Sequence, residues 1–175
     1  MAVQKIIEYP NSLLRKTSTK VTKFDAEFQV LVDDLIETML YQDSMGLAAP
    51  QIGVLQRVFV LNRQRILGKK NQKYQPNDIL CVVNPEIKYK EFLIDSREGC
   101  LSVTQQRGVV KRFERIQLEG LDRNGCPLSM SADGILSILI QHEVDHLDGI
   151  LFIDRLVEEA KTSQSATVLI YDVVG

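Results

Sequence analysis

The sequence carries both of its histidines in one five-residue stretch, 142–146. His142 and His146 stand four positions apart, and Glu143 follows the first of them. On a helix, residues four apart share a face, so two imidazoles can approach one metal ion while the carboxylate stands beside it. The His-Glu-x-x-His pattern therefore predicts a metal site with a carboxylate in reach of a bound water.

A buried helix is expected to carry this pattern. The preceding run, 135–141, is apolar on nearly every side, which predicts a helix in the core. Burying two histidines and two acids there is costly unless something pairs them. A metal ion is one such partner, and the alternative is a pair of core histidines satisfied by hydrogen bonds. Ser131 or Asp133 is expected to cap this helix, and Gly149 to end it after Leu147.

The identity of a third ligand decides what kind of metal site this is. A catalytic zinc site has three protein ligands and one open position, whereas a structural site is closed by four. In one large group of metalloproteases a third histidine follows after a glycine; this chain has Gly149 but then Phe152 at the histidine position. The carboxylates of Asp154 and Glu158 compete for this role with Cys100, which lies upstream.

The remaining elements are expected from periodicity and residue type. Apolar spacing predicts a helix over 25–43 capped by Asp25, and residues 63–78 are polar and predicted to form a loop. β-Branched and aromatic residues predict strands, and an Asn-Gly pair at 124–125 predicts a hairpin. The predicted strands are 58–61, 80–83, 87–94, 108–110, 115–121, 128–130 and 167–171. The fold class expected is α+β, with antiparallel sheets packed around the buried helix that carries the HExxH motif.

Composition limits the kinds of partner. At 175 residues, 45% of them hydrophobic, the chain is expected to form a single catalytic domain over residues 1–175. The net charge of -2, without a basic stripe, argues against direct nucleic acid binding, and no apolar run reaches membrane-spanning length. The amino terminus lacks the apolar core of a signal peptide, so a cytoplasmic location is expected. Cys81, Cys100 and Cys126 are too irregularly spaced for a disulfide framework, and Cys81 is expected to be a small buried hydrophobe.

Three separated motifs carry a resemblance to a known family. They are Gly-Leu-Ala-Ala-Pro-Gln at 46–51, Glu-Gly-Cys-Leu-Ser at 98–102 and Gln-His-Glu-Val-Asp-His-Leu at 141–147. In this order and separation the chain resembles the peptide deformylase family across roughly residues 1–155. The resemblance implies a hydrolase that removes the formyl group from the N-terminal formylmethionine of newly made polypeptides.

The resemblance implies that Cys100, His142 and His146 are the ligands of one divalent metal ion. Family members use ferrous iron (Fe2+) natively, and Zn2+, Ni2+ or Co2+ can occupy the site; thiolate and imidazole ligands suit several of these metals. The implied partners are N-formylmethionyl nascent peptides at the ribosome exit. The family's role implies a bacterial cytoplasm or an organelle.

The resemblance also implies the catalytic residues. A metal with three protein ligands keeps a water in the fourth position and lowers its pKa toward neutrality. Glu143 would take a proton from that water and pass it to the departing amine. Gln51 and the backbone N–H of Leu101 would face the formyl oxygen, where negative charge develops. Gly46 opens a run of small residues that lets the backbone approach the metal and holds Gln51 in place.

Two other functions remain open at this stage. One is a metallopeptidase that cuts internal bonds and uses a downstream carboxylate as third ligand. The other is a non-catalytic module with a closed structural Cys2His2 zinc site, built from Cys81, Cys100 and the two histidines. Replacing Cys100 separates the first alternative from a deformylase, because only the deformylase needs the thiolate.

A departure from the family and two further side chains bear on the site. Ser44 stands where the first family motif opens with glycine; if the position needs φ > 0, serine adds strain. Arg107 lies in a segment that resembles the family's substrate-contacting region. Asp145 is expected to orient a ligand histidine or to pair with an arginine such as Arg112, because buried carboxylates need partners.

Overall fold

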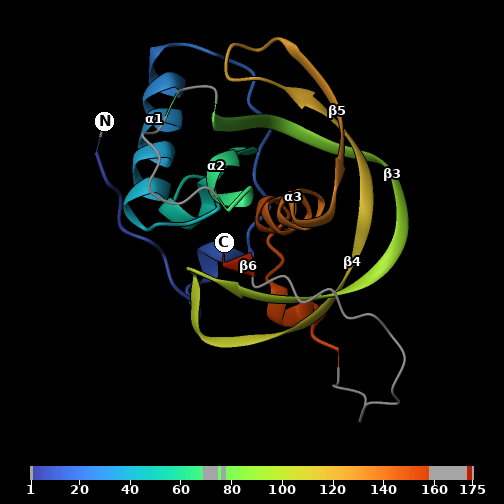
Figure 1. Cartoon of the computed structure of the whole chain (residues 1–175). Helices are drawn as coiled ribbons and strands as arrows, with labels where there is room; N and C mark the ends of the chain where they lie inside the picture. Colours follow the sequence, from blue (N-terminus) through green and yellow to red (C-terminus); the bar gives the residue numbers. More distant parts are fainter. Residues whose placement is uncertain (1, 69–74, 76–77, 158–172, 175) are drawn as a thin grey trace, which may run out of the picture.

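The structure is a computed structural model that describes residues 2–68, 75, 78–157 and 173–174. Figure 1 shows α3 in the middle of the molecule, the long curved strands β3 and β4 on one side of it, and α1 on the other. Its elements are α1 (Ala26–Tyr41), β1 (Gly46–Ala48), β2 (Val58–Asn62), α2 (Arg63–Ile66), β3 (Ile79–Cys100), β4 (Val103–Leu121), β5 (Pro127–Asp133), α3 (Gly134–Leu147), β6 (Val173–Val174) and the short 3-10 turns η1 (Ser12–Arg15), η2 (Ala49–Ile52) and η4 (Phe152–Arg155).

The strands of the described residues form one six-stranded sheet. Its order is β1-β2-β3-β4-β5 with antiparallel neighbours, and β6 pairs with β3 in parallel. The predicted combination of helices with antiparallel pairing is confirmed. The expectation of several antiparallel sheets is wrong for the described part of the chain, because its strands join into a single mixed sheet.

The middle strands are longer than predicted. The segments expected at 80–83 and 87–94 belong to the 22-residue strand β3, and those at 108–110 and 115–121 belong to the 19-residue strand β4. Register shifts interrupt their pairing, for example between Val83 and Glu86. Such bulges move side chains to the opposite face and break the alternation on which the prediction relied. The predicted strand 167–171 lies outside the described residues.

The segment after β2 is also not a plain loop. Residues 63–66 form α2, a four-residue helix, and the side chain of Asn62 caps it by accepting a hydrogen bond from the backbone N–H of Arg65 at 3.2 Å. The prediction of a loop over 63–78 is therefore wrong at its start. Short polar helices of this kind have too few residues to show an apolar period.

Helix α1 forms where its periodicity predicts. The Asp25 side chain accepts a hydrogen bond from the backbone N–H of Phe28 at 3.1 Å, as an N-cap does. Its buried face packs against β2 and the start of β3 in one core cluster. The buried apolar residues of this face are Phe28, Val32, Leu35 and Met39.

Removal of this cap is expected to destabilise the protein modestly. Asp25→Ala removes an acceptor for one of the free N–H groups of the first turn, which costs about 1 kcal/mol in the free energy of unfolding. Urea denaturation followed by circular dichroism measures the change, and Asp25→Asn, which retains the acceptor oxygen, serves as the control. An unchanged midpoint for Asp25→Ala would contradict the assignment of the cap.

Helix α3 lies in a second core cluster, separate from the one that contains α1. Ile138, Leu139 and Ile140 are fully buried and pack with apolar residues of β2, β3 and β4. Of the two predicted caps, Asp133 stands at the N-cap position of α3, but its side chain accepts a hydrogen bond from Arg115 at 2.6 Å and makes no capping hydrogen bond; Ser131 belongs to β5. The end is as predicted, because α3 stops at Leu147 and Gly149 has a φ of 74°.

None of the helices in the described ranges is long and apolar enough to cross a membrane.

Candidate metal centre

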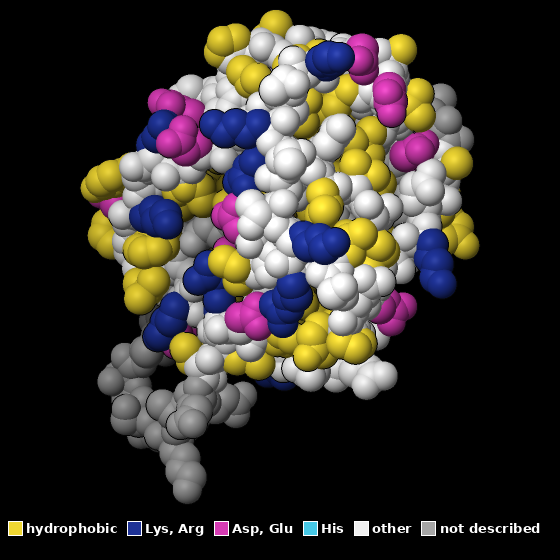
Figure 2. Space-filling view, turned by 180° about the vertical axis from the view of Figure 1, so that it is seen from behind, with side chains coloured by type: hydrophobic (Ala, Val, Ile, Leu, Met, Phe, Trp, Pro, Cys, Tyr) yellow, Lys and Arg dark blue, Asp and Glu magenta, His cyan; other side chains and the backbone are white. Residues whose placement is uncertain are grey.

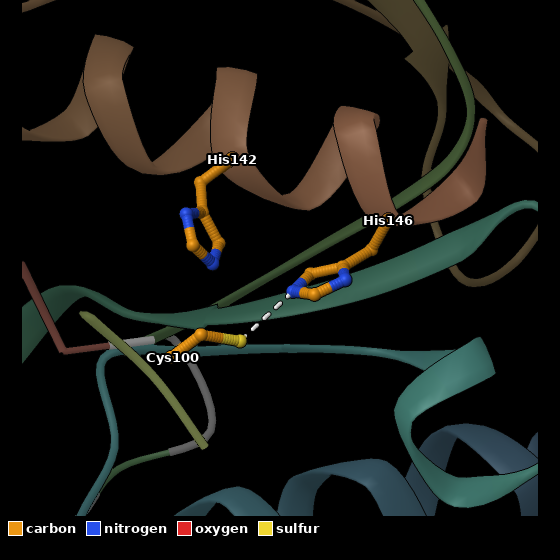
Figure 3. A group of neighbouring side chains, drawn as sticks. All are labelled: Cys100, His142 and His146. Atoms are coloured by element: carbon orange, nitrogen blue, oxygen red, sulfur yellow. Dashed lines mark hydrogen bonds between the residues drawn. The ribbon is translucent and has the colours of Figure 1, made fainter. Parts of the chain in front are cut away.

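Cys100, His142 and His146 come together in the core. Cys100 is the last residue of β3, and the two histidines lie one turn apart on α3. One potential ligand atom from each residue lies within 4.8 Å of the others, and all three residues are buried. Figure 3 shows the thiol and both rings pointing toward a common space, with 3.2 Å between Cys100 Sγ and His146 Nε2. Consistent with this burial, no histidine is visible on the face shown in Figure 2.

The ring nitrogens of these histidines fit a metal ion. His142 Nδ1 lies 2.9 Å from Glu98 Oε2, which fixes the ring orientation and directs Nε2 into the cluster. Nε2 of His142 is buried and has no hydrogen-bond partner among the described residues, and His146 presents Nε2, not Nδ1, toward Cys100. Buried polar atoms are costly to leave unpaired, and a thiolate with imidazoles is a ligand set that divalent zinc or iron accepts.

The two imidazoles differ in their electrostatic surroundings. Burial would lower the pKa of His142, but the neighbouring Cys100 and Glu98 groups raise that pKa well above the usual value. Burial lowers the pKa of His146 well below the usual value. The His146 ring is therefore neutral, and a neutral imidazole has a free lone pair for a metal.

A buried ion-pair network surrounds His142 on the side away from the cysteine. Arg112 donates to both carboxylate oxygens of Glu98, at 2.8 and 2.9 Å, and to Asp145 at 2.6 Å. The predicted pairing of Asp145 with Arg112 is confirmed. Burial alone would raise the pKa of Glu98, but hydrogen bonds from Arg112 and His142 lower it to about 2. Glu98 is therefore an anion at neutral pH, and it orients a candidate metal ligand.

Glu143 is a buried carboxylate without a partner. Its side chain is fully buried, and neither of its oxygens has a hydrogen-bond partner among the described residues. Burial raises its pKa to about 7. Gly46 packs directly against it, because a Cβ built on Gly46 would lie 2.5 Å from Glu143 Oε1. Strongly perturbed acids of this kind, beside a ligand cluster, are candidates for proton transfer.

Gln51 lies beside the Cys100 thiol. Its Oε1 accepts a hydrogen bond from the backbone N–H of Ala48 at 2.8 Å, which fixes the amide orientation. Its Nε2 donates toward Cys100 Sγ at 3.5 Å and Ser102 Oγ at 3.3 Å. The first two sequence motifs thus meet at the thiol, as the resemblance requires. Ser102 was not predicted to have a role, although it closes the second motif.

Ser44 does not carry the strain that its position in the motif suggested. The non-glycine residues of the described ranges with positive φ are Asp43, Asn84 and Phe92. The Ser44 hydroxyl donates to the backbone carbonyl of Gly46 at 2.9 Å and accepts from the Gly46 N–H at 3.3 Å. The serine therefore braces the backbone of β1, and the condition for strain, a positive φ at this position, is not met.

Other candidates from the sequence lie elsewhere. Cys81 packs in the α1 core cluster, where burial raises its pKa to about 12, so it is the buried hydrophobe that was predicted. Asp154 pairs with Arg15 and accepts from the Leu151 N–H. Neither residue belongs to the metal-binding group, and Glu158 lies outside the described residues. Among the competing third ligands, the structure brings Cys100 to the histidines.

The remaining residues of the predicted site lie around this group. Leu101 occupies the tight turn between β3 and β4, directly after Cys100. The Arg107 side chain lies against Gly99. Phe152, at the position of the third histidine in the metalloproteases, stacks on the His142 ring with centroids 6.3 Å apart. At the position where the metalloprotease pattern has a third ligand, this chain has an aromatic side chain that packs on a candidate ligand.

Comparison with known proteins agrees with this geometry. The family model described as Polypeptide deformylase matches residues 3–162. A peptide deformylase from Thermodesulfovibrio yellowstonii is 40% identical over 156 residues, which cover 89% of this chain and 90% of the relative. The crystal structure of a peptide deformylase from Legionella pneumophila matches with a TM-score of 0.80 and 38% identity, covering 89% of this chain and 87% of the other. That of peptide deformylase from Thermotoga maritima matches with a TM-score of 0.80 and 33% identity, covering 90% and 100%. The chain therefore belongs to the polypeptide deformylase family.

Proposed function

We propose that Cys100, His142 and His146 hold one divalent metal ion and that Glu143 transfers protons beside it. As a peptide deformylase, the chain is a hydrolase that removes the formyl group from nascent polypeptides. The observation that carries the assignment of roles is the buried Glu143 carboxylate, which has no hydrogen-bond partner in the described part of the chain, follows His142 in sequence and packs on Gly46. A purely structural site gives no reason to bury such a charge.

Ferrous iron is the native metal that we propose, with Zn2+, Ni2+ or Co2+ able to replace it. The support is the mixed ligand set of one thiolate and two imidazoles, which suits these metals better than magnesium or calcium. When bound, the ion supplies a Lewis acid that polarises a carbonyl group and lowers the pKa of water. Glu98 holds His142 in the orientation that this binding needs.

The proton transfers fall to Glu143. Its carboxylate takes a proton from the attacking water, whose oxygen forms a bond to the formyl carbon. It then gives a proton to the amide nitrogen as the C–N bond breaks, which releases formate and a peptide with a free α-amino group. Both carboxylate oxygens lack other partners among the described residues, so no existing hydrogen bond has to be broken before Glu143 accepts a proton.

Gln51 and the backbone N–H of Leu101 are the proposed donors to the formyl oxygen. Gln51 Nε2 lies beside Cys100 with its orientation fixed by Ala48, and Leu101 follows Cys100 in the turn. Donors held in place before the reaction stabilise the charge that develops on that oxygen. Loss of one such donor typically costs on the order of 3 kcal/mol in the barrier.

The proposal extends to the whole chain and its surroundings. We propose that residues 1–175 act as one catalytic domain, because the family match spans 3–162 and strands β2 and β3 contribute to both large core clusters. The substrates would be N-formylmethionyl peptides at the ribosome exit, in a bacterial cytoplasm or an organelle.

Gly46→Ala is expected to lower kcat/KM for formate release about 10²-fold. The new methyl group would meet Glu143 Oε1 at 2.5 Å and Leu61 Cδ2 at 2.7 Å, so the carboxylate must move. A displacement of about 1 Å in a catalytic group typically has an effect of this size. Metal content and melting temperature, measured on the same samples, separate this displacement from unfolding. Unchanged kinetics would show that Gly46 does not set the position of Glu143.

The assay of function compares two peptides that differ only in the blocking group. Protein prepared without oxygen, which protects the thiolate from oxidation, is incubated with formyl-Met-Ala-Ser and with acetyl-Met-Ala-Ser. We expect formate from the first, little reaction with the second, and no cleavage between residues in either, as judged by mass spectrometry. Internal fragments without formate would support a metallopeptidase instead.

A further inference from the structure

We propose that Arg155 is a positioning residue for the metal centre, acting on His142 through a buried chain of ion pairs. The inference rests on the proposed function in one respect, because it takes His142 to be a metal ligand. Arg155 lies in η4, after the helix that carries the histidines, and its side chain is 42% exposed. By position alone it resembles an ordinary surface residue.

The contacts of Arg155 run inward without a break. Its Nε and Nη2 donate to the two carboxylate oxygens of Asp145, at 2.6 and 2.8 Å. Arg112 donates at 2.6 Å to Asp145 Oδ2, the oxygen that also accepts from Arg155 Nε, and it donates to both oxygens of Glu98. Glu98 in turn lies 2.9 Å from His142 Nδ1. Each link is a charge-assisted contact of hydrogen-bond length, and two of them are bidentate.

Charge balance shows why Arg155 matters to this network. Two carboxylates, Glu98 and Asp145, face two guanidinium groups, those of Arg112 and Arg155, so the charges of these four side chains balance. Glu98, Arg112 and Asp145 are all buried, with exposed fractions of 1%, 3% and 7%. Without Arg155 a single cation would serve both anions, and Asp145 would compete with Glu98 for Arg112. Removing one partner from a buried ion-pair network leaves an uncompensated charge, unlike the loss of a surface pair.

The turn that carries Arg155 also touches the candidate ligand directly. Phe152, the first residue of η4, stacks on His142 with an interplanar angle of 23°. The turn therefore contacts α3 at two points, His142 and Asp145. Displacement of η4 would therefore loosen the packing on the His142 ring and the Arg155–Asp145 pair together.

The chain supplies a matched control on the same turn. Arg15 makes a bidentate pair with Asp154, the residue before Arg155, and the side chains of that pair are 36% and 39% exposed. Arg15→Ala therefore removes an arginine–carboxylate pair from η4 while leaving the buried network intact. A general loosening of the turn would show in both variants, whereas an effect through Asp145 would show in Arg155→Ala alone.

The experiment measures how fast each protein loses metal. Wild type, Arg155→Ala and Arg15→Ala are loaded with one equivalent of Co2+, and transfer of the ion to an excess chelator is followed by the visible absorption of the cobalt protein. We expect loss from Arg155→Ala to be at least about tenfold faster than from wild type, as for other outer partners of metal ligands. Arg15→Ala is expected to stay within about twofold of wild type. We also expect a changed cobalt spectrum in Arg155→Ala only.

Arg155→Lys keeps the charge but cannot donate from a planar fork to two oxygens. Its rate is expected to lie between those of wild type and Arg155→Ala, and this variant carries the test if Arg155→Ala does not fold by circular dichroism. Equal rates and spectra for all the Arg155 variants and wild type, or equal acceleration in Arg15→Ala, would overturn the inference while the proposed function stands. A wild-type protein that binds no cobalt would overturn both.

Discussion

Glu143→Gln is expected to reduce formate release about 10³-fold, within the range of roughly 10²- to 10⁴-fold that general acid–base groups contribute. The amide has nearly the volume of the carboxylate, so the packing against Gly46 can persist, but it cannot accept a proton from water. Kinetics with formyl-Met-Ala-Ser measure the loss. Because the wild-type carboxylate is buried and no described residue pairs with it, we also expect the metal-free variant to melt at the same temperature or higher.

Two controls make this result specific to catalysis. Metal content of Glu143→Gln should equal that of wild type, since the proposed ligands are other residues. Glu27→Gln, in the exposed first turn of α1, changes a carboxylate in the same way outside the site and should keep full activity. A Glu143→Gln protein that kept more than about a tenth of wild-type activity would remove Glu143 from the proton-transfer role.

Cys100→Ala is expected to weaken metal binding by on the order of 10²-fold or more, and formate release should fall with the metal content. The thiolate is the proposed ligand that lies on the sheet, opposite the two imidazoles of α3. Without it two imidazoles remain, fewer than the three protein ligands of a catalytic zinc site. Metal content after dialysis against a weak chelator measures the effect.

Cys81→Ala is the matched control for this change. Cys81 is also a buried cysteine of β3, but burial raises its pKa to about 12, and it packs against α1 away from the ligand group. We expect it to retain a full equivalent of metal. Loss of metal from Cys81→Ala would favour the closed Cys2His2 site. Retention in Cys100→Ala, with loss in Asp154→Ala, would favour the metallopeptidase.

Local patterns account for the parts of the fold that were predictable. The apolar spacing of α1 and its Asp25 cap involve residues within one or two turns of each other, so the sequence displays them directly. The same holds for the two histidines on one face of α3. Bringing Cys100 to them depended on the family resemblance, because 42 positions separate it from His142 and no local pattern spans that distance.

The parts that were not predictable depend on contacts between distant segments. The bulges of β3 hid its length, because each one moves later side chains to the other face. The brace that Ser44 forms on Gly46 depends on a hydroxyl orientation that residue type alone does not specify. No local pattern marks Arg155, because its partner Asp145 lies in α3 and only the geometry of the fold pairs the two side chains.

A metal titration of the wild-type enzyme tests the central claim most directly. Metal-free protein, kept without oxygen, receives increasing Fe2+, and the rate of formate release from formyl-Met-Ala-Ser is recorded at each step. One site built from Cys100, His142 and His146 predicts no release at the start, a linear rise, and a plateau at one equivalent per chain. Full activity of the metal-free protein, or no release at any metal content, would contradict a metal-dependent deformylase.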